Sequence, residues 1–184
     1  MFREIHILVV FVFAFLLLPL WALSAPFCAA GFEFVRDKHG EGCRKYIDGG
    51  AQVVKDGPWK HYYADGKVSA EGGYNRGKRT GAWVERYPSG TVKEQTEYKN
   101  GIKQGAFTRY LRGGQKDEEG AYQKDLPAGT WVQWYPSGKK KSETPWGSAG
   151  KKNGVSKEYF ENGRVKSETT WANGQQSGMA RQWS

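Results

Sequence analysis

The chain has 184 residues, of which 15% are aromatic and 26% are charged, and its formal net charge is +9. This length leaves room for about one domain and excludes a large multidomain architecture. The excess charge is confined to one part of the chain. Residues 25–56 hold five basic and five acidic side chains, whereas residues 57–184 hold 22 basic and 13 acidic ones. We therefore expect an electrostatic partner to bind the second part.

Residues 1–24 have the pattern of a secretory signal peptide. A basic start is followed by the unbroken apolar run of residues 7–18 and by small residues at 22–25, which is the order typical of such a leader. Cleavage is expected after Ser24, which makes the chain an exported protein, periplasmic or extracellular. The alternative is an uncleaved anchor helix over residues 7–23, at the lower limit of what crosses a bilayer.

Residues 25–56 contain Cys28 and Cys43, the two cysteines of the chain. In an exported, oxidising setting an even number of cysteines favours one disulfide, which contributes roughly 3 kcal/mol in the chain-entropy model. The metal alternative lacks a recognised spacing, because only His39 and His61 lie nearby. We expect this segment to form a small disulfide-linked N-terminal cap.

From residue 57 onward the sequence repeats itself, which is decisive for the fold. Its leading glycines follow one another at intervals of 24, 24, 24, 25 and 24 residues. These are Gly57, Gly81, Gly105, Gly129, Gly154 and Gly178. They begin five units and a partial sixth, and a position in a unit is counted from its leading glycine.

The aromatic residues follow the same period. All 18 of those in residues 57–184 occupy four positions of the unit, namely 3, 6, 7 and 18. Scattered placement would put only about one in six there. Position 3 holds Trp59, Trp83, Phe107 and Trp131, and position 18 holds Tyr74, Tyr98, Tyr122, Trp146 and Trp171.

Each unit predicts a β-hairpin. Positions 3 to 7 form a short aromatic strand, and a segment such as Pro88–Gly90 supplies a turn whose glycine tolerates positive φ. In the second strand small or apolar residues alternate with charged ones up to the aromatic of position 18, which places that ring on the buried face. A second turn, such as Lys99–Gly101, leads into the next unit.

We therefore expect an all-β fold, an extended antiparallel meander of about ten strands that forms one elongated, single-layer sheet over residues 57–184. Leucine, isoleucine and valine are scarce in this part. Packing then has to come from aromatic rings, which we expect to stack between successive units into one continuous spine. Stability becomes a sum of contacts between neighbours, so the ends need caps.

The recurring glycine, paired aromatics, glycine turn and closing Tyr or Trp resemble the bacterial variant of the MORN repeat over residues 57–184. The cysteine-bearing segment is similar to one that precedes such arrays in exported bacterial proteins. Some relatives carry an antitoxin-like label, and eukaryotic relatives are associated with membrane lipids and protein assembly, but the resemblance implies no fixed set of functional residues. The units depart from the pattern at Leu111, at Ser156 and at a one-residue insertion near Gly147–Gly150. These departures predict less regular stacking toward the C-terminal end.

No catalytic or metal-binding motif is found, so we expect no enzyme activity, no metal and no cofactor. A ladder of polar residues at position 15 is the strongest acid candidate, consisting of Glu71, Gln95, Glu119, Glu143 and Glu168. Such carboxylates can perform acid/base chemistry on a glycan. A residue that recurs in every unit is better explained by pairing across the sheet with lysines such as Lys93, Lys140 or Lys166.

Basic side chains are the stronger binding candidates. The first unit carries Arg76, Lys78 and Arg79, and the fourth carries Lys139, Lys140, Lys141, Lys151 and Lys152 together with Trp134 and Tyr135. Lysines beside aromatic rings can hold an anionic polymer or headgroup by charge and stacking. The alternative is that these lysines keep a flat sheet soluble and discourage edge pairing.

Taken together, the sequence favours a non-catalytic scaffold that binds a protein or a cell-envelope polymer through its aromatic-lined surface. The alternative is peripheral binding of anionic lipid or polysaccharide through the basic patches of units one and four, which predicts a steep dependence on salt. A glycan-acting enzyme is a third hypothesis. Nucleic acid is a poor partner for an exported chain.

Overall fold

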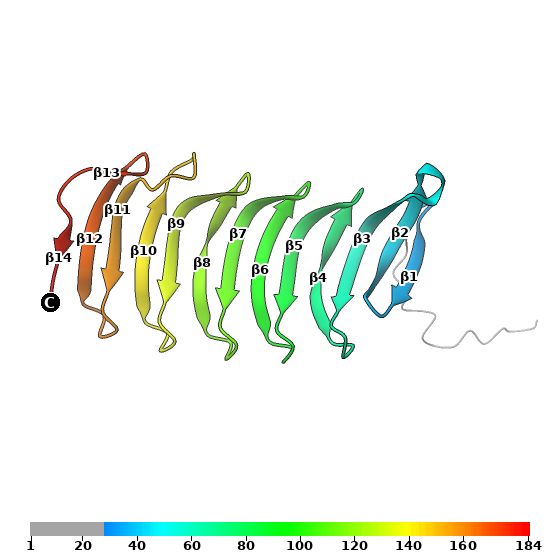
Figure 1. Cartoon of the computed structure of the whole chain (residues 1–184), viewed down its shortest axis with the longest axis horizontal. Helices are drawn as coiled ribbons and strands as arrows, with labels where there is room; N and C mark the ends of the chain where they lie inside the picture. The colour runs from blue at the N-terminus through cyan, green and yellow to red at the C-terminus, as the bar shows by residue number, and fades with distance from the viewer. Residues whose placement is uncertain (1–27) are drawn as a thin grey trace, which may run out of the picture.

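The computed structural model describes residues 28–184 as one open antiparallel sheet (Figure 1). Its strands are β1 (Glu33–Asp37), β2 (Gly40–Ile47), β3 (Gln52–Tyr62), β4 (Val68–Asn75), β5 (Lys78–Arg86), β6 (Val92–Lys99), β7 (Ile102–Tyr110), β8 (Lys116–Gln123), β9 (Leu126–Trp134), β10 (Lys140–Trp146), β11 (Gly154–Tyr159), β12 (Val165–Ala172), β13 (Gln175–Gln176) and β14 (Arg181–Gln182). A short 3-10 turn, Asp48–Gly50, joins β2 to β3. Strands pair in chain order from β1 to β13, and β14 returns to β12.

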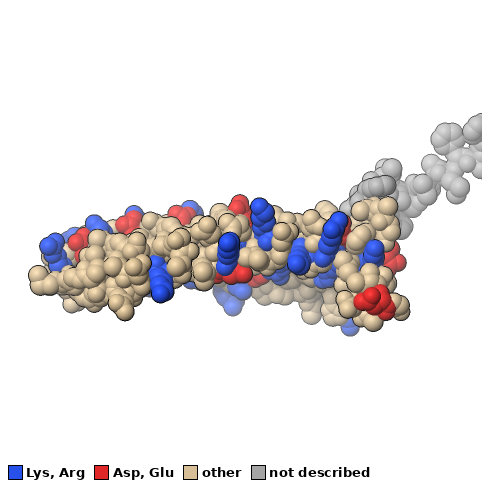
Figure 2. Space-filling view, turned by 90° about the horizontal axis from the view of Figure 1, so that it is seen from above, with Lys and Arg blue, Asp and Glu red and all other residues tan. Residues whose placement is uncertain are grey.

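The predicted all-β meander is confirmed, and the five units supply the strands β3 to β12. Seen from above, the molecule is a long ribbon that carries no second layer (Figure 2). The signal peptide predicted for residues 1–24 lies outside the described residues. So does the alternative anchor helix over residues 7–23.

The two edges of the ribbon carry different turns. At the tight-turn edge, at the top of Figure 1, two-residue turns such as Asn100–Gly101 have positive φ at both residues, 54° and 84°. This is the signature of a type I′ turn, whose twist matches that of the paired strands. At the loop edge, the predicted turn glycines also have positive φ, and Gly90 donates its N–H to the carbonyl of Tyr87 over 2.8 Å. Both kinds of turn therefore lie where the sequence predicted them.

The two faces of the sheet carry different side chains. The ring face holds positions 3 and 18, whose rings meet edge to face, as Tyr122 and Trp131 do with centroids 5.0 Å apart. The opposite face holds positions 6 and 15, which meet in the 2.7 Å hydrogen bond from Tyr159 to Glu143. The expectation that all rings share one continuous stack is thus corrected, because side chains alternate between faces along a strand. The ring contacts of the ring face fall into two clusters, Trp59–Tyr74–Trp83 and Phe107–Tyr122–Trp131.

Each ring at position 3 packs on a small residue at position 16 of the preceding hairpin, and we call that small residue the floor of the ring. Trp83 is only 1% exposed because its indole lies on Gly72, where an added Cβ would overlap the ring. Its Nε1–H donates to the carbonyl of Gly73 over 3.0 Å. In the next pair the ring is smaller and its floor larger, with Phe107 at 3% exposure against Thr96 at 4%. Ring and floor thus compensate each other in volume, as a closely packed contact requires.

The N-terminal cap supplies the floor for the first ring. Cys28 and Cys43 form the predicted disulfide, and β2 continues the sheet beside β3. The indole of Trp59 lies on Gly42 and donates to the carbonyl of Cys43 over 2.8 Å. The cap therefore makes the same indole-on-glycine contact with the first unit that the first unit makes with the second and the third with the fourth.

Tyrosines at position 7 join successive hairpins along the loop edge. Tyr87 donates its hydroxyl to the carbonyl of Tyr110 in the next unit over 2.8 Å, and Tyr135 does the same toward Tyr159. Tyr63 makes the equivalent bond to Arg86. Leu111 replaces the tyrosine in the third unit, so the same bond cannot form between units three and four.

Replacing Tyr87 by Phe is expected to lower the free energy of unfolding by about 0.5–1.5 kcal/mol, the usual net contribution of one hydrogen bond. Urea denaturation measures this change. Tyr46→Phe is the control, since Tyr46 is 49% exposed, and it should change stability by much less. Equal effects of the two substitutions would contradict the role given to the Tyr87 hydroxyl.

Candidate binding face

A row of cations lies over the aromatic rings of the ring face. Each cation stands two residues before a leading glycine, so it falls on the ring face close to the tight-turn edge. The clearest contacts are Lys55 at 4.3 Å from the centroid of Trp59, Arg79 at 4.1 Å from Trp83, Lys103 at 4.8 Å from Tyr122 and Lys152 at 4.5 Å from Trp171. Contacts of this geometry contribute about 0.5–1 kcal/mol each at exposed sites. Pro127 takes the equivalent place in the third unit, two residues before Gly129, and interrupts the row.

Ion-paired acids line the same face nearer the loop edge. Arg109 bonds Asp117 over 2.7 Å and Glu118 over 3.0 Å. Burial alone would lower the pKa of Arg109, but the hydrogen bond that Arg109 donates to Asp117 and the negative charge of Glu118 outweigh burial and raise that pKa. The ring face therefore presents cations near one edge and a mixed polar network near the other.

His61 lies within the first ring cluster. Its ring centroid is 6.0 Å from that of Trp59 and 5.9 Å from that of Trp83, and its Nε2 is 3.5 Å from the Tyr74 hydroxyl. Burial lowers the pKa of His61, and the positive charges of Lys55 and Arg79 lower it further. The neutral imidazole is thus the form that fits this part of the ring face.

Acidification is expected to destabilise the fold through His61. Because the folded pKa lies below the ordinary value of about 6.5, the unfolded chain binds the proton more readily, and stability falls as the pH drops from 6.5 toward the folded pKa. Urea midpoints at pH 7.5 and 5.5 measure this, and His61→Gln should show a smaller difference between the two pH values. The control His39→Gln should keep the wild-type difference. A His61→Gln protein with an unchanged difference would refute the assignment.

The acids of position 15 lie together on the opposite face, as predicted, but most of their partners differ from those expected. Glu143 pairs with Lys140 as expected. The other acids pair elsewhere: Glu71 with Arg86 over 2.6 Å, Glu119 with Lys116 over 2.7 Å, and Glu168 with Lys157 over 3.0 Å. Lys93 and Lys166 instead reach Glu85 and Glu158, at 3.8 and 3.9 Å.

Burial and the hydrogen bond to Glu143 raise the pKa of Tyr159 to about 12.

The basic residues selected from the sequence occupy two different edges. Lys139, Lys140 and Lys141 lie at the loop-edge end of β10, whereas Lys151 and Lys152 follow its tight-turn end. Arg76, Lys78 and Arg79 also lie at the tight-turn edge, which Figure 2 views from above with basic side chains spaced along it.

The two predicted aromatics have structural contacts. The ring of Trp134 lies 5.5 Å from the Lys116 ammonium on the opposite face. Tyr135 joins two hairpins through its hydroxyl and receives Lys141 at 6.0 Å. Of the predicted binding residues, Arg79 and Lys152 belong to the cation row.

Sequence reasoning did not identify Lys55, Lys103 or the Arg109 network. The sequence did contain a signal for Lys55 and Lys103, since a basic residue stands two positions before four of the six leading glycines. The Arg109 network has no such period, because positions 5 and 14 change type from unit to unit. Only the register of the sheet brings these side chains together.

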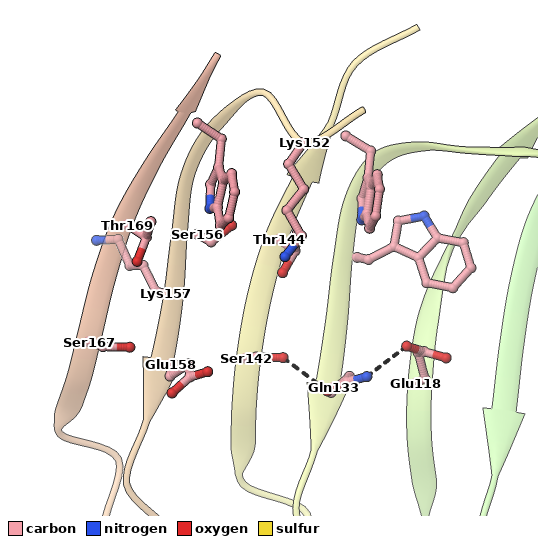
Figure 3. A pocket seen from close by; sticks show the side chains of 13 residues that line it. Glu118, Gln133, Ser142, Thr144, Lys152, Ser156, Lys157, Glu158, Ser167 and Thr169 are labelled. Atoms are coloured by element: carbon pink, nitrogen blue, oxygen red, sulfur yellow. Dashed lines mark hydrogen bonds between the residues drawn. The ribbon is translucent and has the colours of Figure 1, made fainter. Parts of the chain in front are cut away.

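Residues 28–184 border hollows in the surface, two of which bear on the ring face and its neighbourhood. One, of about 360 Å³, lies on the ring face between units four and five and is bordered by Trp131, Trp146 and Trp171 (Figure 3). The other, of about 560 Å³, is more open and is lined by Pro58, Ala82 and Val84 with neighbouring glycines of the first two units. The first hollow lies at Ser156, where the other four complete units carry an aromatic ring at position 3.

Two features of other protein classes are absent from residues 28–184. No group of three or more His, Cys, Asp or Glu side chains in this part is placed to hold a metal ion. No helix in the same range has the length and apolarity of a membrane span.

Fold and surface define a tandem β-hairpin repeat protein whose units pack through ring and floor and expose a cation-covered aromatic face. Four segments match the family model of the MORN repeat variant, at residues 55–76, 79–100, 128–146 and 152–173. The chain is therefore a protein of the MORN-repeat family. No curated protein sequence matches it. The third unit falls between the matched segments, yet it forms the hairpin β7–β8 with the same pairing as the others.

Proposed function

We propose that the chain is a non-catalytic repeat scaffold that binds a protein or a cell-envelope component through its ring face. MORN repeats are in general non-catalytic modules that are often used in binding. The observation that carries the proposal is the row of Lys55, Arg79, Lys103 and Lys152 over the rings. These cations are held in fixed places by the rings, so their positions are preorganised for a partner that brings negative or hydrogen-bond-accepting groups.

An exported location fits this role. The Cys28–Cys43 disulfide supports an oxidising compartment, since disulfides persist in periplasmic and extracellular proteins and are rare in the cytosol. The proposal places the mature chain there, after removal of residues 1–24. Its partner is then another exported protein or a polymer of the envelope.

A second candidate is peripheral binding of anionic lipid or polysaccharide. The observation in its favour is that the basic residues Arg76, Lys78 and Lys151 share the tight-turn edge with the cation row. Lys139 to Lys141 lie at the other edge, so a flat anionic surface cannot contact both groups through one edge. Such binding depends on exposed charges and weakens strongly with salt.

Matched charge variants test the proposed face. Lys55, Arg79 and Lys103 are changed together to Gln on the ring face, and Lys60, Lys116 and Lys140 together on the opposite face, so both variants lose three positive charges. Capture of material from the cell envelope by the immobilised chain should fall about tenfold for the first variant, at roughly 0.5 kcal/mol for each exposed charge contact. The second variant should keep capture close to wild type.

Three results would decide against this proposal. Equal loss in both variants shows that net charge, and not the ring face, controls capture. Equal retention in both shows that the face is not the binding surface. Salt-sensitive binding to vesicles that contain phosphatidylglycerol, lost on changing Arg76, Lys78 and Lys151 to Gln, favours the second candidate.

A further inference from the structure

Among the five complete units, the ring-and-floor rule fails at one place, between units four and five. Three indoles, those of Trp59, Trp83 and Trp131, lie on the glycines Gly42, Gly72 and Gly120, and Phe107 lies against Thr96. In the fifth unit position 3 is Ser156, and its expected floor in the fourth hairpin is Thr144. Neither residue has the volume of a ring, so the place of a phenyl group is left open.

The strands also separate there. β10 and β11 pair only through Ser142 with Glu158 and Glu143 with Lys157. The inserted residue makes the turn at residues 147–150 longer, and Asn153 donates its N–H to the carbonyl of Pro145 over 3.0 Å. In earlier units the equivalent carbonyl, that of Gly73 for example, accepts the indole N–H of position 3. The insertion therefore brings the N–H of Asn153 to the Pro145 carbonyl, which would otherwise accept the indole N–H of a tryptophan at position 3.

The result is a slot on the ring face with unused hydrogen-bonding capacity. Its volume of about 360 Å³ falls in the range of roughly 300–1,000 Å³ typical of small-molecule sites. Within residues 28–184, Ser156 Oγ and Trp171 Nε1 are the two buried side-chain polar atoms that lack a hydrogen-bond partner, and both residues line this slot. Buried polar groups without a partner are rare, which points to a partner supplied from outside.

The lining combines flat aromatic walls with short hydroxyl side chains. Thr144, Ser156 and Thr169 lie in a row across β10, β11 and β12 (Figure 3). Beside them runs a hydrogen-bonded chain in which Ser142 donates to Gln133 over 3.2 Å and Gln133 donates to Glu118 over 2.8 Å. The indoles of Trp146 and Trp171 and the ammonium of Lys152 border the other side.

We propose that the slot at Ser156 binds one pyranose residue of a neutral glycan. The face of an indole carries negative partial charge, which attracts the polarised C–H groups on the flat side of a sugar ring. The sugar hydroxyls both donate and accept, so they can pair with Ser156 Oγ, Trp171 Nε1 and the Glu118 carboxylate together. An apolar side chain of a protein partner would fill the volume but leave Ser156 Oγ and Trp171 Nε1 without partners, at a cost of about 1–3 kcal/mol each.

This inference rests on the proposal that the ring face is a binding surface, and it names the ligand class for one place on that face. The tests use the chain without its leader, residues 25–184. Chitotetraose and maltotetraose are the probes, titrated calorimetrically and by tryptophan fluorescence.

Ser156→Phe is the decisive variant, because phenylalanine is the ring that fits over a threonine floor, as Phe107 does over Thr96. It should raise the Tm by about 2–4 °C through filling the slot and weaken saccharide binding at least tenfold. Val155→Phe adds the same ring one residue away, at a side chain that is 44% exposed, and should bind like wild type. Trp171→Phe keeps a ring and removes the indole N–H, which should weaken binding roughly three- to tenfold.

Several outcomes overturn the inference. They are no binding of either saccharide by the wild-type chain, wild-type affinity in Ser156→Phe, and equal weakening by Val155→Phe. Binding of N-acetyltryptophanamide that Ser156→Phe abolishes, with no saccharide binding, assigns the slot to an aromatic side chain of a protein partner instead. If envelope capture still depends on Lys55, Arg79 and Lys103 in that case, the proposed function stands and only the glycan assignment fails.

Discussion

A single-layer sheet has no opposing layer to bury its side chains, so each hairpin depends on its neighbour. The backbone ladder holds the strands side by side, and the ring of position 3 excludes water above the ladder by packing on the floor residue of the preceding hairpin. The sizes of ring and floor differ between units: a large indole, Trp83, packs on Gly72, whereas a smaller ring, Phe107, packs on the larger Thr96. The cap continues the rule with Gly42 below Trp59, and the slot at Ser156 is the place where the rule lapses.

Most of the fold was predictable from the period of the sequence. Glycines at a fixed interval located both kinds of turn, and the alternation in each second strand assigned position 18 to the packed face. The prediction was wrong in treating all aromatics as one stack, because positions 3 and 6 are an odd number of residues apart and point to opposite faces. The structural roles of Tyr87 and Tyr135 were not accessible either, since a side-chain bond to a carbonyl in the next unit depends on register.

The candidate site was less predictable, for a physical reason. Clusters of basic residues in the sequence drew attention to Lys139–Lys141. These residues lie at the loop-edge end of the seven-residue strand β10, whose other end is at the tight-turn edge. The cations of the row are instead single residues that lie about 24 positions apart in the sequence, or twice that where Pro127 interrupts the row. They come together only because the units stack side by side in the sheet. Ser156 was recognised as a departure from the pattern. Only the three-dimensional structure shows that Ser156 and Thr144 line one slot, that the turn beside it is longer and that the indole N–H of Trp171 has no partner.

The packing of a ring on the floor of the preceding hairpin is tested most directly by a double-mutant cycle on Gly72 and Trp83. Gly72→Ala alone should lower the free energy of unfolding by about 1–3 kcal/mol, because the added methyl group overlaps the indole. With Trp83→Phe in the same chain, the smaller ring accommodates the methyl group. The double variant should then be more stable than the sum of the single effects by at least about 1 kcal/mol. Additive effects, within about 0.5 kcal/mol, would show that ring and floor are not coupled and would contradict the account.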